Sequence, residues 1–181
     1  ADLLKRADRA LYAAKAAGRN THVVFDESLE DEVLALQALQ RELRVALTAN
    51  ELEMQFQPEF SLVDGHVLGA EALLRWEHPH RGLIAADEFI PAAEHSGLID
   101  EIGRFALGEA CRRFVTIPGT DGLILRVNIS AREFSRPELP DLVEAALAES
   151  GLDPERLCLE MTETTLMDAP ELVLATFTRL S

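Results

Sequence analysis

Three side chains with oxygen donors, Glu71, Asn128 and Glu160, occupy similar places in three segments with β-strand patterning. Successive side chains of an extended strand point to opposite faces, and each of the three lies opposite an apolar row. Carboxylate and amide oxygens are hard donors that suit Mg²⁺ or Mn²⁺, whereas zinc favours His and Cys. If the strands lie side by side, we expect these residues to hold a divalent cation that assists hydrolysis of a phosphodiester.

Three further polar residues are candidates for the same site. We expect Gln57 and Arg75 to contact an anionic substrate, because a guanidinium is planar, bidentate and always charged. Glu163 comes just after the third strand, where the chain turns away, and we expect it to orient a ligand or a water.

The same residues admit other interpretations. Glu71 and Arg75 share one strand face and can form a structural ion pair, and an Asn in a strand more often bonds the backbone. Glu71 and Glu160 can also be the acid and the nucleophile of a retaining glycosidase, which needs carboxyl groups about 5–5.5 Å apart and no metal. The pattern leaves these alternatives open.

The strand predicted at residues 66–76 is the element around which the others are expected to assemble. One of its faces is an unbroken apolar row, and the other carries Glu71 and Arg75. Asp64-Gly65 is a strong turn signal that predicts a hairpin with a strand at residues 52–62. Further strands are predicted at 21–25, 123–130 and 157–161, a loop at 77–82, and helices at 1–19, 28–50, 87–95 with Asp87 as N-cap, 100–116, 141–150 and 170–180.

The order of these elements predicts the fold class. Strands that alternate with helices pair in parallel, and right-handed crossovers place the helices outside. Eight such units close a barrel of about 250 residues, of which residues 51–181 supply about half. We therefore expect an α/β fold that forms the N-terminal half of a (β/α)8 TIM-type barrel, preceded by a helix–strand remnant and an amphipathic linker helix.

The predicted linker helix carries an apolar row at steps of three and four, as in a coiled coil. The row either pairs with a partner helix, which would make a homodimer, or packs on the domain that follows in the same chain. Both interpretations fit its residues, which are Leu29, Val33, Leu36, Leu43 and Leu47.

The composition of the chain argues against several classes of protein. The net charge of −15 argues against binding to a nucleic-acid polymer, and no apolar stretch approaches the roughly 20 residues of a membrane span. Cys111 and Cys158 have neither metal-ligand nor disulfide spacing, so we expect small buried hydrophobes in a reducing, cytoplasmic compartment. We expect the histidines to be solvated; they are His22, His66, His78, His80 and His95.

Five ordered motifs within residues 52–181 resemble those of EAL domains, which are cyclic di-GMP phosphodiesterases built on a variant (β/α)8 barrel. The resemblance implies that Glu71, Asn128 and Glu160 bind the metal. It also implies that Gln57 and Arg75 contact the dinucleotide and that Glu163 supports the catalytic site. The motifs are Gln57-Pro58, Glu71-Ala72-Leu73-Leu74-Arg75-Trp76, Glu88-Phe89-Ile90-Pro91, Val127-Asn128-Ile129-Ser130-Ala131 and Leu159-Glu160-Met161-Thr162-Glu163.

The chain also departs from that family's pattern. In EAL domains a following strand brings an Asp-Asp pair that completes the metal site, and later strands bring a catalytic Lys. This sequence ends at Ser181 and has no Lys after Lys15. We therefore expect the 181-residue polypeptide to be inactive on its own.

Residues 7–20 resemble the closing helix of GGDEF (diguanylate cyclase) domains. The predicted organisation is a GGDEF remnant at 1–25, a linker helix at 26–50 and the N-terminal portion of an EAL domain at 51–181. One hypothesis is a piece of a bifunctional GGDEF–EAL protein whose complete form hydrolyses cyclic di-GMP to linear pGpG. The alternative is a degenerate, non-catalytic module that binds cyclic di-GMP or a partner. The predicted partners are cyclic di-GMP and a second copy of the chain, in a homodimer through the linker helix or the EAL domain.

Overall fold

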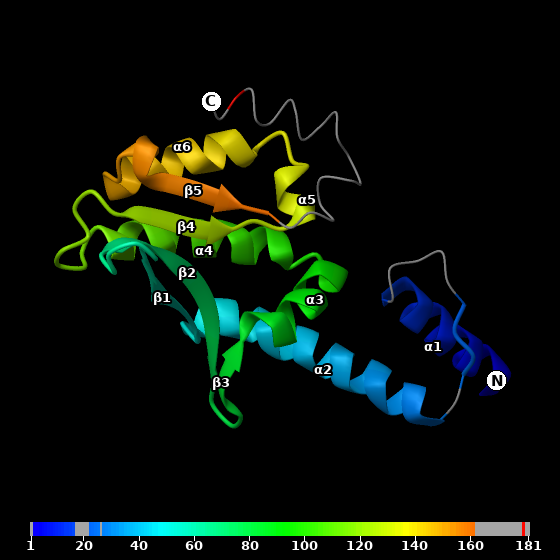
Figure 1. Ribbon diagram of the computed structural model, residues 1–181. Helices are drawn as coiled ribbons and strands as arrows, with labels where there is room; N and C mark the ends of the chain where they lie inside the picture. Colours follow the sequence, from blue (N-terminus) through cyan, green and yellow to red (C-terminus); the bar gives the residue numbers. More distant parts are fainter. Residues whose placement is uncertain (1, 17–21, 26, 162–178, 180–181) are drawn as a thin grey trace.

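The structure is a computed structural model that describes residues 2–16, 22–25, 27–161 and 179. Two helices come first, and a mixed sheet with further helices follows (Figure 1). The strands are β1 (Leu52–Phe60), β2 (Val67–His78), β3 (Gly82–Ala85), β4 (Ile124–Asn128) and β5 (Leu157–Glu160). The helices are α1 (Asp2–Ala16), α2 (Glu27–Ala49), α3 (Ala86–Ser96), α4 (Ile99–Phe114), α5 (Ala131–Phe134) and α6 (Leu139–Ser150), with a 3₁₀ turn at Pro154–Arg156.

The sheet has the strand order β1-β2-β4-β5, with β3 paired to β2. β1 and β3 run antiparallel to β2, whereas β2–β4 and β4–β5 are parallel pairs. Helices α3 and α4 connect β2 and β3 to β4, and α5 and α6 connect β4 to β5. This alternation confirms the predicted α/β class and the partial barrel.

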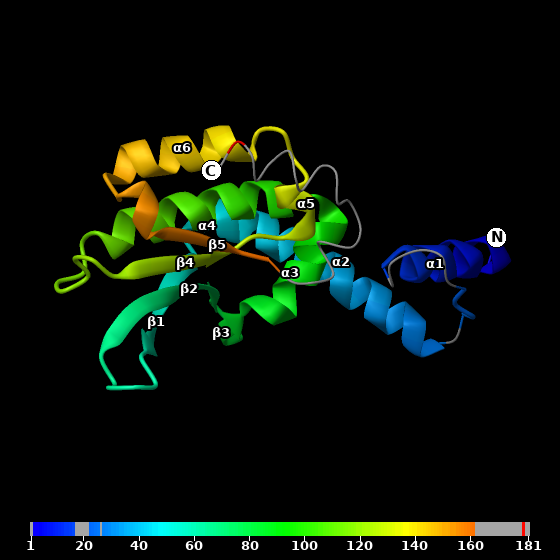
Figure 2. The same cartoon turned by 45° about the horizontal axis from the view of Figure 1, so that its top comes forward.

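Helices α4 and α6 lie together on one face of the sheet (Figure 2). The strand positions on this face are buried and apolar, such as Ala72, Trp76 and Leu125. Burial of this row is the main stabilising term of the domain, because apolar area removed from water contributes about 25 cal/mol per Å². The opposite face is covered by no helix among the described elements, and it carries the candidate site residues.

Helix α2 packs on the domain that follows it. Leu43 and Ala46 belong to the hydrophobic core, Leu47 packs against that core, and Val33 is buried. Of the two interpretations of its apolar row, the structure therefore favours packing within the chain.

His78 is buried, so the prediction of a solvated side chain is wrong for this histidine. Its Nδ1 accepts hydrogen bonds from the backbone N–H groups of His80 (3.1 Å) and Arg81 (3.3 Å). Its Nε2 lies 3.3 Å from Glu42 Oε2 on α2, and its ring packs 4.9 Å from that of Trp76. His78 thus closes the β2–β3 turn and ties it to α2.

Three local predictions need correction, and one short helix has no counterpart among the predicted elements. Residues 77–82 are not simply a loop, because β2 runs on to His78 and β3 begins at Gly82. The described residues 22–25 form no strand, and α5 was not foreseen. Helix α3 begins at Ala86 after an Ala85 N-cap without a side-chain hydrogen bond, so Asp87 lies in the first turn. The helix predicted at 170–180 falls outside the described residues except for Arg179, which is helical.

Among the helices that the structure describes, none combines the length and the apolar composition that a membrane span requires.

Two glycines of α4 provide a matched test of the packing between α4 and α5. A Cβ at Gly103 would collide with the Glu133 carboxylate, whereas a Cβ at Gly108 would meet nothing within 4 Å. We expect Gly103→Ala to destabilise the protein by about 1–3 kcal/mol through overpacking. Gly108→Ala should stabilise it by about 0.5–1 kcal/mol, because alanine favours a helix interior over glycine.

Urea denaturation of both variants beside the parent protein measures these two changes. Equal effects of the two substitutions would contradict the close approach of Glu133 to Gly103.

Candidate functional site

Glu71 and Asn128 are brought into contact by the parallel pairing of β2 and β4. The Asn128 Nδ2 group donates a hydrogen bond of 2.7 Å to Glu71 Oε1. An amide side chain has nearly the same shape after a half-turn, so it can instead present Oδ1 to a cation beside the carboxylate. Glu71 is half-buried and Asn128 is exposed, which leaves the pair accessible to a ligand.

Glu160 stands directly opposite Asn128 in the register of β4 and β5. Its Oε1 accepts a hydrogen bond of 3.2 Å from Nη1 of Arg126. The three predicted metal ligands therefore occupy one face of adjacent strands, with Glu71 bonded to Asn128 and Glu160 held by an arginine.

Arg126 is a further member of this face and is not among the site residues predicted from the sequence. Its Nε group donates a hydrogen bond of 2.6 Å to Glu59 Oε2 on β1, and Nη1 also lies 3.3 Å from Cys158 Sγ. The hydrogen bond to Glu59 is the largest of the effects that raise the pKa of Arg126, so the guanidinium keeps its charge. Strand alternation places Arg126 on the same face as Asn128, and that signal was available in the sequence.

The two cysteines differ in environment. Cys111 is fully buried in the core, and burial raises the pKa of its thiol to about 11, as expected for an inert hydrophobe. Cys158 is only half-buried and lies beside Arg126 on the site face, so the prediction of a buried hydrophobe is wrong for this residue.

The other predicted site residues, Gln57, Arg75 and Glu163, make no described side-chain contact with the three predicted metal ligands. Gln57 lies opposite Glu71 in the β1–β2 register and is exposed. Arg75 is half-buried and donates from Nη1 to the backbone carbonyl of Leu74 at 3.0 Å. The partners of Glu71 and Arg75 are thus Asn128 and a carbonyl, and the proposed Glu71–Arg75 ion pair is not formed. Glu163 lies outside the described residues.

A cavity of about 480 Å³ lies between the carboxyl ends of the strands and helices α3 and α4. Its walls are largely apolar, with Ala72, Leu74 and Ile102 among them. Asn128, Ser130, Glu133 and Glu160 bring polar groups to its edge. The candidate ligands Asn128 and Glu160 therefore adjoin a hollow as well as the open face.

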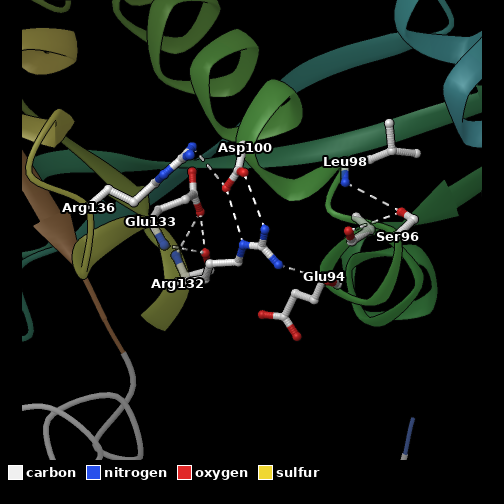
Figure 3. A network of polar contacts seen from close by, with 9 residues as sticks. Glu94, Ser96, Leu98, Asp100, Arg132, Glu133 and Arg136 are labelled. Atoms are coloured by element: carbon white, nitrogen blue, oxygen red, sulfur yellow. Dashed lines mark hydrogen bonds and ion pairs between the residues drawn. The ribbon is translucent and has the colours of Figure 1, made fainter. Parts of the chain in front are cut away.

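Glu133 is a buried carboxylate that the sequence analysis did not single out (Figure 3). Its Oε2 accepts hydrogen bonds from Ser130 N–H (3.0 Å) and Ser130 O–H (2.5 Å), and the Glu133 N–H donates to Ser130 Oγ at 3.3 Å. This is a capping box at the start of α5, and Ser130-Ala131-Arg132-Glu133 carries its sequence signature. The box fixes the turn that begins two residues after Asn128.

Asp100 at the start of α4 holds two arginines of the same region (Figure 3). Its Oδ1 lies 3.5 Å from Arg132 Nε and 3.1 Å from Arg136 Nη1. Oδ1 is buried and accepts no well-directed hydrogen bond within the part of the chain that is described, so charge attraction dominates these contacts. They attach the segment after β4 to α4.

The chemistry of the donor set fits Mg²⁺ or Mn²⁺. Glu71, Asn128 and Glu160 offer hard oxygens from three neighbouring strands. Asn128 and Glu160 end β4 and β5, at the edge where barrel enzymes place their active sites, whereas Glu71 lies within β2 and reaches Asn128 through its side chain. The set contains two acids and one amide, and no cluster of three His, Cys, Asp or Glu side chains suited to a metal occurs in the described ranges.

Comparison with known proteins agrees with this geometry. The family model of the EAL domain matches residues 40–181. MucR of Pseudomonas aeruginosa, a bifunctional diguanylate cyclase/cyclic di-GMP phosphodiesterase, is 40% identical over 99% of this chain and 27% of that protein. The cyclic di-GMP phosphodiesterase NbdA of the same organism is 40% identical over 92% of this chain and 22% of its own length.

Among solved structures, the MucR phosphodiesterase in complex with cyclic di-GMP superposes with a TM-score of 0.74 at 41% identity. The match covers 79% of this chain and 59% of that one. The chain spans about a quarter of the length of the two curated relatives.

The stability of the protein should depend on the charge of Glu133. Burial raises the pKa of this carboxyl, with Asp100 and Glu94 adding repulsion, although hydrogen bonds from Ser130 oppose the shift. A raised pKa means that the group contributes most to stability when protonated, and that this contribution is lost as pH rises through the folded-state pKa. We expect Glu133→Gln, which keeps the capping box, to gain stability relative to the parent progressively as the pH rises above about 4.3, the ordinary pKa of glutamate.

Urea denaturation of the parent and the variant across that range measures this difference. A difference that stays constant with pH would show that Glu133 does not titrate with a raised pKa.

Proposed function

Because the chain belongs to the EAL domain family, we propose that its complete protein hydrolyses cyclic di-GMP to linear pGpG by metal-assisted phosphodiester hydrolysis. The observation that carries the proposal is the contact of 2.7 Å between Asn128 and Glu71, in strands whose register also places Glu160 beside Asn128. Two relatives that are 40% identical are named as cyclic di-GMP phosphodiesterases, which supports this substrate.

In this proposal Glu71, Asn128 and Glu160 hold Mg²⁺ or Mn²⁺ through their oxygens. Such a cation, when bound, lowers the pKa of a coordinated water and neutralises charge on phosphoryl oxygens. Gln57 and Arg75 contact the dinucleotide, and Arg75 can do so through the guanidinium N–H groups that are not bonded to the Leu74 carbonyl. Glu163 acts as the catalytic residue that orients the attacking water.

The competing function is a non-catalytic module that binds cyclic di-GMP or a protein partner. The same fold supports both, so turnover and not binding distinguishes them. Binding of cyclic di-GMP without production of pGpG, in the presence of Mg²⁺ or Mn²⁺, would favour the binding module.

The predicted domain organisation remains part of the proposal: a GGDEF remnant at 1–25, a linker helix at 26–50 and an EAL portion at 51–181. Leu3, Leu4 and Leu11 of α1 are 80%, 72% and 54% exposed, as expected for a helix whose packing partner lies in a preceding domain. A reading frame that extends upstream without a GGDEF signature would contradict the first assignment.

A cytoplasmic location and a homodimer through α2 or the EAL domain belong to the same proposal, and sedimentation analysis tests the dimer.

Removal of a metal ligand tests the proposed activity. In the protein as its gene encodes it, we expect Glu71→Gln and Glu160→Gln each to lower the rate of pGpG formation on the order of 100-fold or more, because each removes an anionic metal ligand. Glu149→Gln, on the exposed side of α6, is the matched control and should keep the parent rate.

Product analysis with and without a chelator completes this test. Loss of turnover on chelation excludes the metal-free glycosidase-type chemistry of Glu71 and Glu160, whereas an active Glu71→Gln protein would contradict the assigned ligands.

A further inference from the structure

The guanidinium of Arg126 joins three strands on the site face. It donates from Nε to Glu59 on β1 at 2.6 Å and from Nη1 to Glu160 on β5 at 3.2 Å, and it also contacts Cys158. Arg126 is on β4, so the side chain must pass over β2 to reach β1. Glu59 stands opposite Gly69 in the β1–β2 register, and a Cβ at Gly69 would collide with the Ile124 carbonyl of β4, so the glycine allows β2 and β4 to approach closely there.

We propose that Arg126 is a positioning residue for the metal ligand Glu160, and that Glu59 compensates the charge which Arg126 brings to the site. This inference rests on the proposed function, because it takes Glu160 as a ligand of Mg²⁺ or Mn²⁺. Arg126 binds Oε1 of Glu160 and leaves the second carboxylate oxygen for the cation. Ligating carboxylates are commonly held in this way by a hydrogen bond from outside the metal's own ligands.

A guanidinium beside a metal site can also act against the metal, because it repels the cation and competes for its ligand. The distances decide between the two roles. The contact with Glu59 is the shorter one, at 2.6 Å against 3.2 Å for Glu160. The positive charge is therefore paired mainly with Glu59, and Glu160 is held by a longer hydrogen bond that leaves it free to bind a cation.

The forked shape of arginine is needed for this arrangement. The Nε group donates to Glu59, while Nη1 donates to Glu160 and Cys158. The ammonium group of a lysine, on its flexible side chain, does not offer donors in that fixed geometry. The three contacts come from β1 and β5, which are not neighbours in the sheet. Arg126 thereby fixes the Glu160 carboxylate relative to a strand on the far side of Glu71.

Direct measurement of Mn²⁺ binding tests this role without relying on turnover. The complete protein, as its gene encodes it, is titrated with Mn²⁺ by calorimetry, and the heat that is lost in Glu71→Gln is assigned to the site. We expect Arg126→Met to raise the Kd for Mn²⁺ about tenfold, the size typical of losing such a supporting contact. Glu59→Gln should weaken binding as well, because it leaves the Arg126 charge uncompensated.

Arg112→Met is the matched control. Arg112 is paired with Glu109 on the exposed surface of α4, so its removal should leave the Kd unchanged. If Arg126→Met does not fold, Arg126→Lys replaces it and should weaken binding in the same direction by a smaller factor. An unchanged or tighter Kd in Arg126→Met, or in Arg126→Lys where that is used, overturns the positioning role. A parent protein that binds no Mn²⁺ at the site overturns the proposed metal centre, and this inference with it.

Discussion

The parallel register of β2, β4 and β5 is the constraint on which the candidate site depends. It sets Glu71 opposite Arg126 and Asn128 opposite Glu160, all on the face away from the helices. Side chains alternate with a period of two, so a slip of one residue in either pairing would turn the polar groups into the apolar layer. Burial of Ala72, Leu125 and their neighbours in the hydrophobic core excludes that slip. The hydrophobic face thus determines the arrangement of the polar one.

The charged side chains on the polar face form ion pairs across strands, between Arg126 and both Glu59 and Glu160. Arg126, Glu59 and Glu160 are each about one-third exposed, so none is stripped of water in the part of the barrel that is described. Ion pairs of this kind contribute little to stability when exposed, and their main consequence is geometric. They hold carboxylates in a few defined orientations, which a metal or a phosphate group requires.

Much of this could be predicted from the sequence, and the misses have physical causes. Alternation identified β1, β2, β4 and β5, and with them Glu71, Asn128 and Glu160, because a period-two pattern needs no knowledge of neighbours. The contact of Arg126 with Glu59 could not be predicted in the same way, since it depends on which strands become neighbours across a distance of 67 residues. His78 was misjudged because its burial comes from packing against α2, a tertiary contact with no local signal.

The capping box at α5 shows how the two faces of the sheet are connected. Glu133 holds Ser130, two residues beyond Asn128, and its carboxylate sits against Gly103 on α4. A Cβ at position 103 would overlap the Glu133 carboxylate, so that carboxylate would have to shift from the place where it bonds Ser130. Packing between α4 and the sheet therefore bears on the position of Asn128, although α4 carries no ligand. The small residue in the helix and the buried acid in the turn are one structural unit, and the site depends on both.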